Sequence, residues 1–277
     1  MQTNVDLKTV EGFGEEWSRF DQTGMSETEL AEQFERYFAV FPFERLPAGA
    51  EGFDLGCGSG RWAKLMAERV GRLHCIDASA EALAVAKKNL ALAGNVEFHN
   101  ASVAEIPLDD DSMDFGYSLG VLHHIPDTAE GIRSCVRKIK PGAPFLVYLY
   151  YAFDNRPAWF RGVWKFSELF RRTISVMPFG LKKVVTDGIA VTVYFPLAKI
   201  AALLEKTGAN VESFPLSVYR HHSFYTMRTD ALDRFGTRLE QRFTRAEITE
   251  MMTKAGLENI EFSDGFPFWC AVGFKKR

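Results

Sequence analysis

A glycine-rich loop at residues 56–60 constrains the fold of this chain more than any other stretch of its sequence. The loop reads Gly-Cys-Gly-Ser-Gly, follows a short apolar segment at 51–55 and precedes a helical pattern at 61–70. Glycines let the backbone turn tightly and approach a ligand, and the helix that follows points its first N–H groups at the same place. The sequence therefore predicts a strand, a ligand-binding turn and a helix in immediate succession.

The same alternation of strands and helices continues after this unit. Strands are predicted at 72–77, 95–100, 114–118 and 143–150, with helices that begin after Ser79 and after Asp127 between them. A helix capped by Thr244 is then followed by two strands, 257–263 and 268–275, with no helix between them, so one of the two runs antiparallel. Strands that alternate with helices predict an α/β fold with a doubly wound, mostly parallel sheet.

Two segments fall outside this alternation. Residues 1–48 contain an amphipathic helical pattern at 27–41, and residues 150–242 contain helical stretches at 159–176 and 197–207. We therefore expect an N-terminal helical cap over 1–48, a core domain over 49–149, a largely helical insertion or lid over 150–242, and a C-terminal helix and hairpin over 243–277 that completes the core.

Charge is spread unevenly along the chain. Residues 1–150 hold 14 Lys and Arg against 23 Asp and Glu, whereas residues 151–228 hold 11 against 5. The whole chain has a net charge of −3, which gives no global electrostatic case for binding nucleic acid. The basic middle segment indicates either a separate structural piece with its own role or an ordinary solvated surface.

The cysteines and the apolar runs favour a cytoplasmic protein. None of the four cysteines forms a CxxC pair, so reduced thiols are expected rather than a zinc cage or a disulfide scaffold. The first residues contain no apolar stretch of the signal-peptide kind. The longest charge-free run near residue 190 covers 11 residues, 188–198, and a spanning helix needs about 20. We therefore expect no membrane-spanning helix.

Five motifs occur in an order that resembles the class I S-adenosylmethionine (AdoMet)-dependent methyltransferases. They are DLGCGSG (54–60), CIDAS (75–79), NASVAEIPL (100–108), DFGYSLGVLHHIPD (114–127) and KPGAPFLVY (140–148). The loop departs from the GxGxxG pattern of dinucleotide-binding proteins, because Arg61 stands where the third glycine would be. The resemblance implies a seven-stranded sheet with its last strand antiparallel. It also implies that AdoMet lies across the carboxyl ends of the strands, as ligands do in open α/β sheets.

The resemblance assigns cofactor contacts residue by residue. Gly56, Gly58 and Gly60 would pass under the methionyl and ribose parts, Asp54 would hold the amino end, Asp77 the ribose hydroxyls, Ala78 the adenine, and Leu119 would border the sulfonium. Asp77 also ends a predicted strand, where a carboxylate can accept from both hydroxyls of a ribose or can simply cap a helix. The family often has an acid that accepts from the adenine amino group. Ser102 stands there instead, and its hydroxyl or the backbone of Val103 would take that contact.

His123 and His124 follow the fourth strand, where the methyl acceptor is expected. Methyl transfer requires an acceptor held in line with the S–CH₃ bond, and a base is needed only if the acceptor must lose a proton. Histidine has a suitable pKa for a base, so both are candidate catalytic residues. The competing interpretation is structural, because such a pair is frequent in this family. No carboxylates cluster near them in the sequence, so no metal is expected.

The acceptor is expected to be a small molecule bound by the two segments outside the sheet. In the front segment Phe13, Trp17 and Phe20 would close over the cofactor. In the insertion, the candidate acceptor-binding residues are Tyr151, Arg220, His221, His222 and Tyr225, which combine aromatic rings with polar groups. Most of the other aromatic residues in the insertion are better explained as its own core.

Three functional hypotheses remain open. The first is methyl transfer to a polar metabolite or a glycan-precursor hydroxyl. The second is methyl transfer to an apolar quinone or lipid, favoured by the basic amphipathic stretch 159–177, which could contact a membrane surface. The third is a non-catalytic AdoMet-binding module. Methylation of nucleic acid is disfavoured, because the motif that places a flipped base is absent after the fourth strand.

Overall fold

The chain forms two compact units in a computed structural model that describes residues 4–19 and 24–277. Unit 1 comprises Met1–Gln22, Leu30–Ala152 and Leu239–Arg277. Unit 2 comprises Thr23–Glu29 and Phe153–Arg238. The insertion expected over 150–242 thus corresponds closely to the main segment of unit 2, whereas the front segment contributes to both units.

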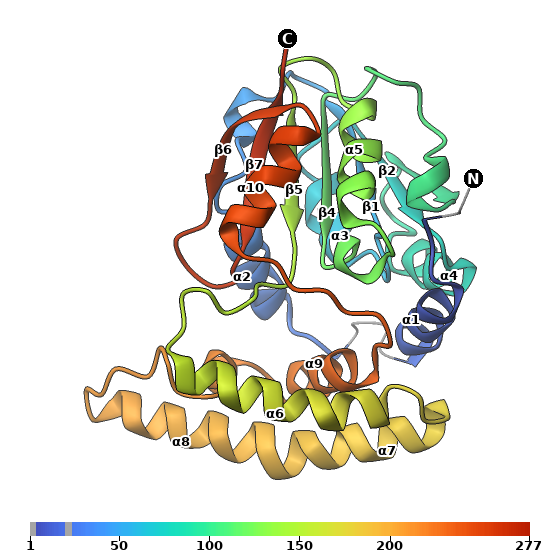
Figure 1. The fold of residues 1–277 in the computed structure, drawn as a ribbon. Helices are drawn as coiled ribbons and strands as arrows, with labels where there is room; N and C mark the ends of the chain where they lie inside the picture. Colours follow the sequence, from blue (N-terminus) through green and yellow to red (C-terminus); the bar gives the residue numbers. More distant parts are fainter. Residues whose placement is uncertain (1–3, 20–23) are drawn as a thin grey trace. The chain divides into compact units, whose positions relative to one another are not determined.

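Unit 1 is built on a seven-stranded sheet in the order β3-β2-β1-β4-β5-β7-β6 (Figure 1). The strands are β1 (Glu51–Leu55), β2 (Arg72–Asp77), β3 (Val96–Asn100), β4 (Phe115–Leu119), β5 (Pro144–Tyr148), β6 (Leu257–Phe262) and β7 (Cys270–Lys275). The first five strands pair in parallel, and β7 is antiparallel to both β5 and β6. The predicted doubly wound, mostly parallel sheet with an antiparallel last strand is confirmed.

Helices connect these strands and begin where the sequence places their caps. The helices of unit 1 are α1 (Leu7–Arg19), α3 (Arg61–Ala67), α4 (Ala80–Asn89), α5 (Thr128–Lys138) and α10 (Arg245–Lys254), and α2 (Glu27–Tyr37) belongs to unit 1 from Leu30 onward. The side chains of Ser79, Asp127 and Thr244 accept N–H groups in the first turns of α4, α5 and α10. Helix α1 was not predicted.

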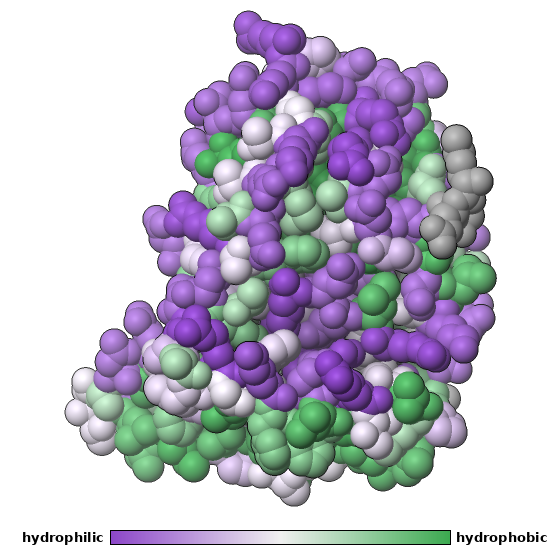
Figure 2. All heavy atoms as spheres, viewed as in Figure 1, coloured by the Kyte–Doolittle hydropathy of each residue, from purple (hydrophilic) through white to green (hydrophobic). Residues whose placement is uncertain are grey.

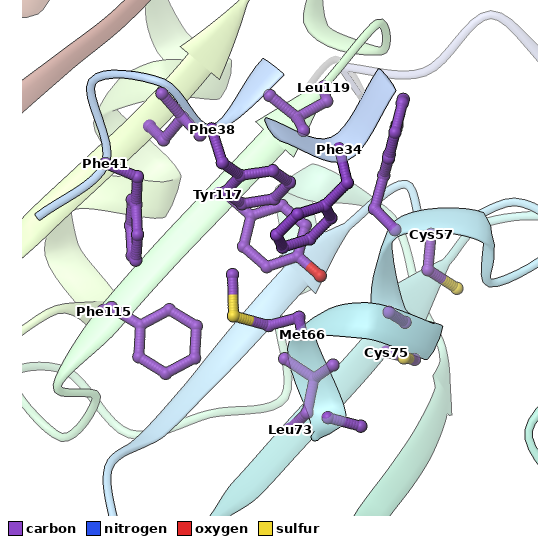
Figure 3. Close-up of a cluster of buried hydrophobic side chains, with 14 of the residues drawn as sticks. Phe34, Phe38, Phe41, Cys57, Met66, Leu73, Cys75, Phe115, Tyr117 and Leu119 are labelled. Atoms are coloured by element: carbon purple, nitrogen blue, oxygen red, sulfur yellow. The ribbon is translucent and has the colours of Figure 1, made fainter. Parts of the chain in front are cut away.

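An aromatic cluster fills one face of the sheet in unit 1. Figure 3 shows Phe34, Phe38 and Phe41 of the front segment packed around Tyr117 and Phe115 of β4. The rings of Phe38 and Tyr117 meet edge to face with their centroids 5.2 Å apart. The front segment from Leu30 onward is therefore part of the core of this unit.

A short ladder of backbone hydrogen bonds joins the two segments of unit 1 between which the insertion lies in the sequence. The N–H of Ala152 donates to the carbonyl of Phe243 at 2.9 Å, and the N–H of Phe243 donates to the carbonyl of Tyr150 at 2.8 Å. The chain just after β5 and the chain just before α10 are therefore tied to each other by backbone hydrogen bonds.

Unit 2 is helical, as the insertion was predicted to be. Its elements are α6 (Ala158–Ile174), α7 (Phe179–Ile189), a π-helical segment (Ala190–Tyr194), α8 (Phe195–Lys206), a 3₁₀ turn (Ser217–His221) and α9 (Phe224–Gly236). Buried side chains of these helices form a small core of their own that includes Ile174, Tyr194, Met227 and Phe235. Helices α6 and α8 match the predicted stretches, whereas α7 and α9 were not predicted.

Helix α7, the π-helical segment and α8 join into one helix of 28 residues, Phe179–Lys206. Its most apolar window of 18 residues has a mean hydropathy of 1.5, so by length and composition it could cross a membrane. The count of uninterrupted charge-free residues missed the length of this helix, because Lys199 ends that run without ending the helix, and the expectation that no helix spans a membrane stays a prediction. Core helices of water-soluble proteins reach similar values, so the contacts of this helix are the better guide to its role.

Candidate active site

A cavity opens in unit 1 at the carboxyl ends of β1, β2 and β4. The strand order changes direction between β1 and β4, and ligands of open α/β sheets bind at such a switch point. The lining comes from the loop after β1, from the ends of β2, β3 and β4, and from the N-terminal segment with α1. The described lining residues are Val5, Asp6, Thr9, Val10, Phe13, Trp17, Leu55–Ser59, Arg61, Trp62, Asp77–Ser79, Ala101–Val103, Leu119–Val121, His124 and Ile125.

The glycine loop forms the floor of this cavity. Gly56 and Gly58 have φ angles of +77° and +54°, a conformation that side chains disfavour. A Cβ on Gly56 would lie 2.3 Å from Val121, and one on Gly58 would lie 3.1 Å from the Trp17 indole nitrogen. Both glycines line the cavity, and their contacts with the methionyl and ribose parts of a cofactor stay predictions. Gly60, which starts α3 and donates to the Cys57 carbonyl at 2.8 Å, is not among the described lining residues.

Asp77 is held between the loop and the start of α4. Its Oδ2 accepts the N–H of Gly58 at 2.8 Å, and its Oδ1 accepts the N–H of Ser79 at 2.8 Å. Burial raises the pKa of Asp77, and these two hydrogen bonds oppose the rise. The carboxylate is thus fixed in orientation at the cavity wall, where its remaining lone pairs suit the two hydroxyls of a ribose.

Asp54 carries a second carboxyl group close to the loop and is the penultimate residue of β1. Its side chain is buried, and its Oδ2 has no hydrogen-bond partner among the described residues. Burial raises the pKa of Asp54 to about 8. The described lining does not include Asp54, so its predicted contact with the amino end of a ligand stays a prediction. A hydrogen bond with Tyr117 opposes the rise in pKa, and the unpartnered Oδ2 suits a cationic ligand.

The remaining predicted cofactor positions lie together in the same cavity. Ala78, Ser102, Val103 and Leu119 all belong to its lining. The Ser102 hydroxyl oxygen accepts the N–H of Ala104 at 3.2 Å, which leaves its own proton available to a ligand. Side chains from three strand ends therefore converge on one ligand-sized space.

His124 belongs to the cavity wall. Its Nδ1 lies 2.7 Å from the carbonyl oxygen of Leu239, which must accept a proton, so Nδ1 is the protonated nitrogen and Nε2 carries the lone pair. The ring of Phe13 lies against it with centroids 5.0 Å apart. This tautomer leaves Nε2 as the basic nitrogen, but Nε2 is a buried atom, so the role of His124 as a base stays a prediction.

His123 has a different environment although it is the neighbouring residue. It is fully buried, and its ring stacks on Tyr150 with centroids 3.9 Å apart. Burial lowers the pKa of His123 well below its ordinary value, and neither ring nitrogen has a hydrogen-bond partner in the described part of the chain. The lining does not include His123, so the predicted pair is divided between the wall of the cavity and the protein interior.

The predicted acceptor-binding residues lie in several places. Trp17 and Phe13 line the cavity, and Phe20 lies outside the described residues. Tyr151 is buried in unit 1 against Phe268, with ring centroids 5.6 Å apart, and is not among the described lining residues.

The other four candidate acceptor residues belong to unit 2. Arg220 and His221 both bind Glu205, through Nε at 2.9 Å and through Nε2 at 2.8 Å. The ring of His222 lies edge-on to Tyr219, and Tyr225 lies in the first turn of α9. These contacts explain Arg220 and His221 structurally, and a role of the four residues in acceptor binding stays a prediction.

The segment that contains α1 adds Val5, Asp6, Thr9 and Val10, which were not predicted, to the lining beside the predicted Phe13 and Trp17. Asp6 accepts the N–H of Thr9 at 2.8 Å and so caps this helix. Gly14 allows α1 to approach α4, because a Cβ there would lie 2.7 Å from the Ser79 hydroxyl oxygen. A signal was present, since Val10, Phe13 and Trp17 recur at helical spacing.

A cluster of possible metal ligands lies on β2 and β3. Ligand atoms of His74, Glu97 and His99 all lie within 4.8 Å of one another. His74 Nδ1 is 3.0 Å from His99 Nε2, and His74 Nε2 is 2.8 Å from a carboxylate oxygen of Glu51. These hydrogen bonds account for the cluster without an ion, and the expectation of a metal-free protein stays a prediction.

Comparison with known proteins places the cavity in a recognised kind of domain. Residues 53–147, from β1 to β5, match a family model described as a methyltransferase domain. The chain is 32% identical over 124 residues to a probable S-adenosylmethionine-dependent methyltransferase of Mycolicibacterium smegmatis, a match that covers 43% of this chain and 46% of that protein. It is 32% identical over 111 residues to a ubiquinone biosynthesis O-methyltransferase of Nitrosospira multiformis, covering 39% and 45%. The chain thus spans less than half the length of these curated relatives.

Solved structures extend the likeness of fold over almost the whole chain. A SAM-dependent methyltransferase from Aquifex aeolicus superimposes with a TM-score of 0.51 at 13% identity, covering 93% of this chain and 96% of that one. A chain in the complex that contains the Trm112 methyltransferase activator of Haloferax volcanii gives a TM-score of 0.55 at 16% identity, covering 96% and 98%. At such identities the likeness shows the fold.

Proposed function

We propose that this chain is a class I AdoMet-dependent methyltransferase and that it transfers a methyl group from AdoMet to a small-molecule acceptor. The observation that carries the proposal is the Asp77 carboxylate, fixed by the N–H groups of Gly58 and Ser79 in the wall of the cavity at the switch point of the sheet. A carboxylate held in this way is preorganised for a ribose.

The residues of the cavity suit AdoMet as a whole. Asp77 would accept the ribose hydroxyls, while Ala78, Ser102 and Val103 would hold the adenine. The buried carboxyl of Asp54 lacks a partner for Oδ2, and a cationic ligand would supply one. When bound, AdoMet supplies a methyl group already activated by the sulfonium. The work left to the chain is to orient the acceptor and exclude water.

Helix α1 and the turn after β4 provide the groups for that work. Val10, Phe13 and Ile125 give the wall an apolar surface, which disfavours water near the sulfonium. Nε2 of His124, which is unprotonated and buried beside the cavity, is the group that would take a proton from an acceptor hydroxyl as the methyl group is transferred. In this proposal His124 is the catalytic base and His123 supports the packing behind it.

We propose further that the acceptor has an apolar body and a hydroxyl group. The apolar wall formed by Val5, Val10, Phe13 and Ile125 supports this choice. Several relatives are named ubiquinone biosynthesis O-methyltransferase, which agrees with it. The alternative of a polar metabolite depended on the cluster at residues 220–222, in which Arg220 and His221 are bound to Glu205.

An assay with methyl-labelled AdoMet tests both parts of the proposal. Purified protein would be incubated with separate lipid and water-soluble extracts of the source cells, and the label counted after partition between organic and aqueous phases. We expect label in the organic phase, lost in the His124→Gln variant. Label in the aqueous phase alone would overturn the apolar acceptor. AdoMet bound with no label in either phase would favour the non-catalytic binding module.

A further inference from the structure

Unit 2 exposes an unusual number of large apolar side chains. They lie on α6 and on the long helix Phe179–Lys206, and Figure 2 shows hydrophobic residues gathered over α6, α7 and α8. We call this surface the outer face, and define it by Trp159, Val163, Phe166, Leu169, Phe170, Leu181, Val184, Val191, Val193, Phe195, Ile200 and Leu203. A monomeric water-soluble protein rarely exposes so large an apolar patch without using it.

The long helix buries several small residues and exposes several large apolar ones. On the long helix Thr186, Ala190 and Ala198 are fully buried, whereas Phe195 and Leu203 are 41% and 65% exposed. Although Tyr194 of this helix is buried in the core of unit 2, many of its large apolar residues face outward, where a water-soluble helix usually has polar ones. On α6 the exposed positions 159, 163, 166 and 170 follow helical spacing and form a single stripe.

The charge around the outer face is positive. Residues 158–206 contain eight Lys and Arg against three Asp and Glu, a net charge of +5. Each of the three acids is bound to a basic partner: Glu168 to Arg171, Asp187 to Lys183 and Arg228, and Glu205 to Arg220. The exposed basic residues beside the apolar stripe are Arg161, Lys165, Arg172, Lys199 and Lys206. An apolar surface flanked by cations matches an anionic lipid surface.

Contacts with α9 show how the long helix would lie against such a surface. Asp187, in the middle of this helix, accepts two hydrogen bonds from Arg228 of α9, both at 2.9 Å. On the other side of α9, Arg234 binds Glu168 of α6 at 3.1 Å. A spanning orientation would carry the pair of Asp187 and Arg228 into the hydrocarbon, which is costly. Helices that lie flat keep these pairs away from the lipid and place the outer face against it.

A second copy of the chain fits the outer face less well. In a two-fold interface the same patch meets itself, so the exposed cations of one copy would approach those of the other. Like charges brought together in this way oppose association. Anionic headgroups would instead neutralise these cations while the acyl region covers the apolar stripe.

We infer that the outer face of unit 2 attaches the protein to the surface of a bilayer that contains anionic lipids, with α6 and the long helix lying in the interface. The inference concerns attachment alone, and it goes beyond the proposed methyl transfer because it requires neither AdoMet nor a particular acceptor. Its test can therefore fail independently of the proposed function.

Vesicle flotation of the purified full chain tests this inference. The probes are vesicles of phosphatidylcholine, with and without phosphatidylglycerol, at low and at high salt. We expect the protein to float with the vesicles that contain phosphatidylglycerol, and to float less at high salt because salt screens the cations. Arg161→Gln combined with Lys165→Gln should weaken binding about fivefold for each charge removed.

Paired variants separate the outer face from the rest of the surface. Phe166→Glu with Leu203→Glu should reduce vesicle binding by about tenfold or more, because two inserted apolar side chains are replaced by anions. The matched controls are Leu92→Glu and Lys276→Gln, which change an exposed leucine and an exposed lysine in unit 1 and should leave binding unchanged. Circular dichroism and AdoMet affinity equal to the parent protein would show that each variant is folded.

Three results would overturn the inference. One is a parent protein that does not float with anionic vesicles. Another is an equal loss of binding in the Leu92→Glu or Lys276→Gln control. The third is light scattering that shows a dimer, converted to monomer by Phe166→Glu with Leu203→Glu, together with no flotation, because a second copy would then cover the outer face.

Discussion

At the scale of single residues, the cavity depends on groups whose protonation and orientation are fixed by the fold. Asp77, Asp54 and His124 each have an environment that a short motif could not specify, since burial and backbone contacts come from distant parts of the chain. These environments lead to three predictions, of which those on Asp77 and Asp54 can be measured without knowing the acceptor.

Removal of the Asp77 carboxylate should weaken AdoMet binding. Asp77→Ala takes away the acceptor for the ribose hydroxyls and also releases the N–H of Gly58, which fixes the loop. Hydrogen bonds to a charged group contribute about 1.5–3 kcal/mol each, so we expect a loss in affinity of at least about tenfold. Isothermal titration calorimetry with AdoMet measures it, and an affinity equal to that of the parent protein would exclude the ribose assignment.

The pH dependence of stability should report the buried carboxyl of Asp54. Its pKa is about 8 in the folded protein and near its ordinary value of 3.8 in the unfolded chain. Between these values the folded state keeps a proton that the unfolded state loses, so the free energy of unfolding falls as the pH rises. For a single proton the slope reaches about 1.4 kcal/mol per pH unit.

Urea unfolding of the ligand-free protein across this pH range measures the effect. Asp54→Asn has no charge at any pH, so it should show a smaller fall in stability between pH 4 and 8, values that bracket the two pKa values. If the free energies of unfolding of the parent protein and the variant changed with pH in the same way, Asp54 would be ionised in the folded state and the prediction would be wrong.

Substitution of His124 should lower activity, whereas substitution of His123 should leave it nearly unchanged. His124→Gln removes the candidate base and should lower the turnover number by about 10²-fold or more, while AdoMet affinity is retained. His123→Phe keeps an aromatic ring where neither nitrogen has a described partner, so activity and stability should stay close to those of the parent protein. Loss of turnover in His123→Phe with full activity in His124→Gln would reverse the assignment.

At the scale of elements, α1 depends on one small residue for its place beside the cavity. A larger side chain at Gly14 would collide with Ser79 at the start of α4, because even a Cβ would lie 2.7 Å from its hydroxyl oxygen. The helix carries Phe13 and Trp17 of the cavity wall, so its displacement would open the site to water.

We therefore expect Gly14→Leu to weaken AdoMet binding and lower the turnover number together. Gly12→Leu is the matched control, because a Cβ at Gly12 meets nothing within 4 Å in the same helix. A difference of about tenfold between the two variants would correspond to about 1.4 kcal/mol of lost wall contacts. Equal affinities, measured by calorimetry, would show that α1 does not contribute to cofactor binding.

At the scale of the whole molecule, the sheet was predictable and the helical unit only partly so. Strands such as β1 and β4 are short apolar runs that end in turn residues, and the caps of α4, α5 and α10 lie in the local sequence. Helix α7 contains Val184, Val185 and Thr186, whose branched side chains weaken a helical prediction, and its helix is stabilised by packing against α9. Packing against α9 thus stabilises a helix that the local sequence did not predict.

Some positions of the site could likewise be predicted from the local sequence, whereas others depend on contacts between distant segments of the chain. Cofactor positions at Gly56, Gly58 and Asp77 follow directly from strand ends, so the sequence sufficed to bring them together. Phe13 and Trp17 were expected over the cofactor, but the packing of α1 against α4 could not be predicted, because it joins segments more than 60 residues apart in the chain. The separation of His123 from His124 arises in a single 3₁₀ turn, which sends adjacent side chains into different surroundings.

The ladder that joins Tyr150 and Ala152 to Phe243 has an evolutionary consequence. Because the departing and returning chain are bonded to each other there, the sheet has no structural need for the roughly ninety residues that lie between them. A descendant gene could gain, lose or exchange that whole passage in one recombination event and still encode an intact cofactor fold. The methyltransferase-domain model matches residues 53–147, which end before that passage begins.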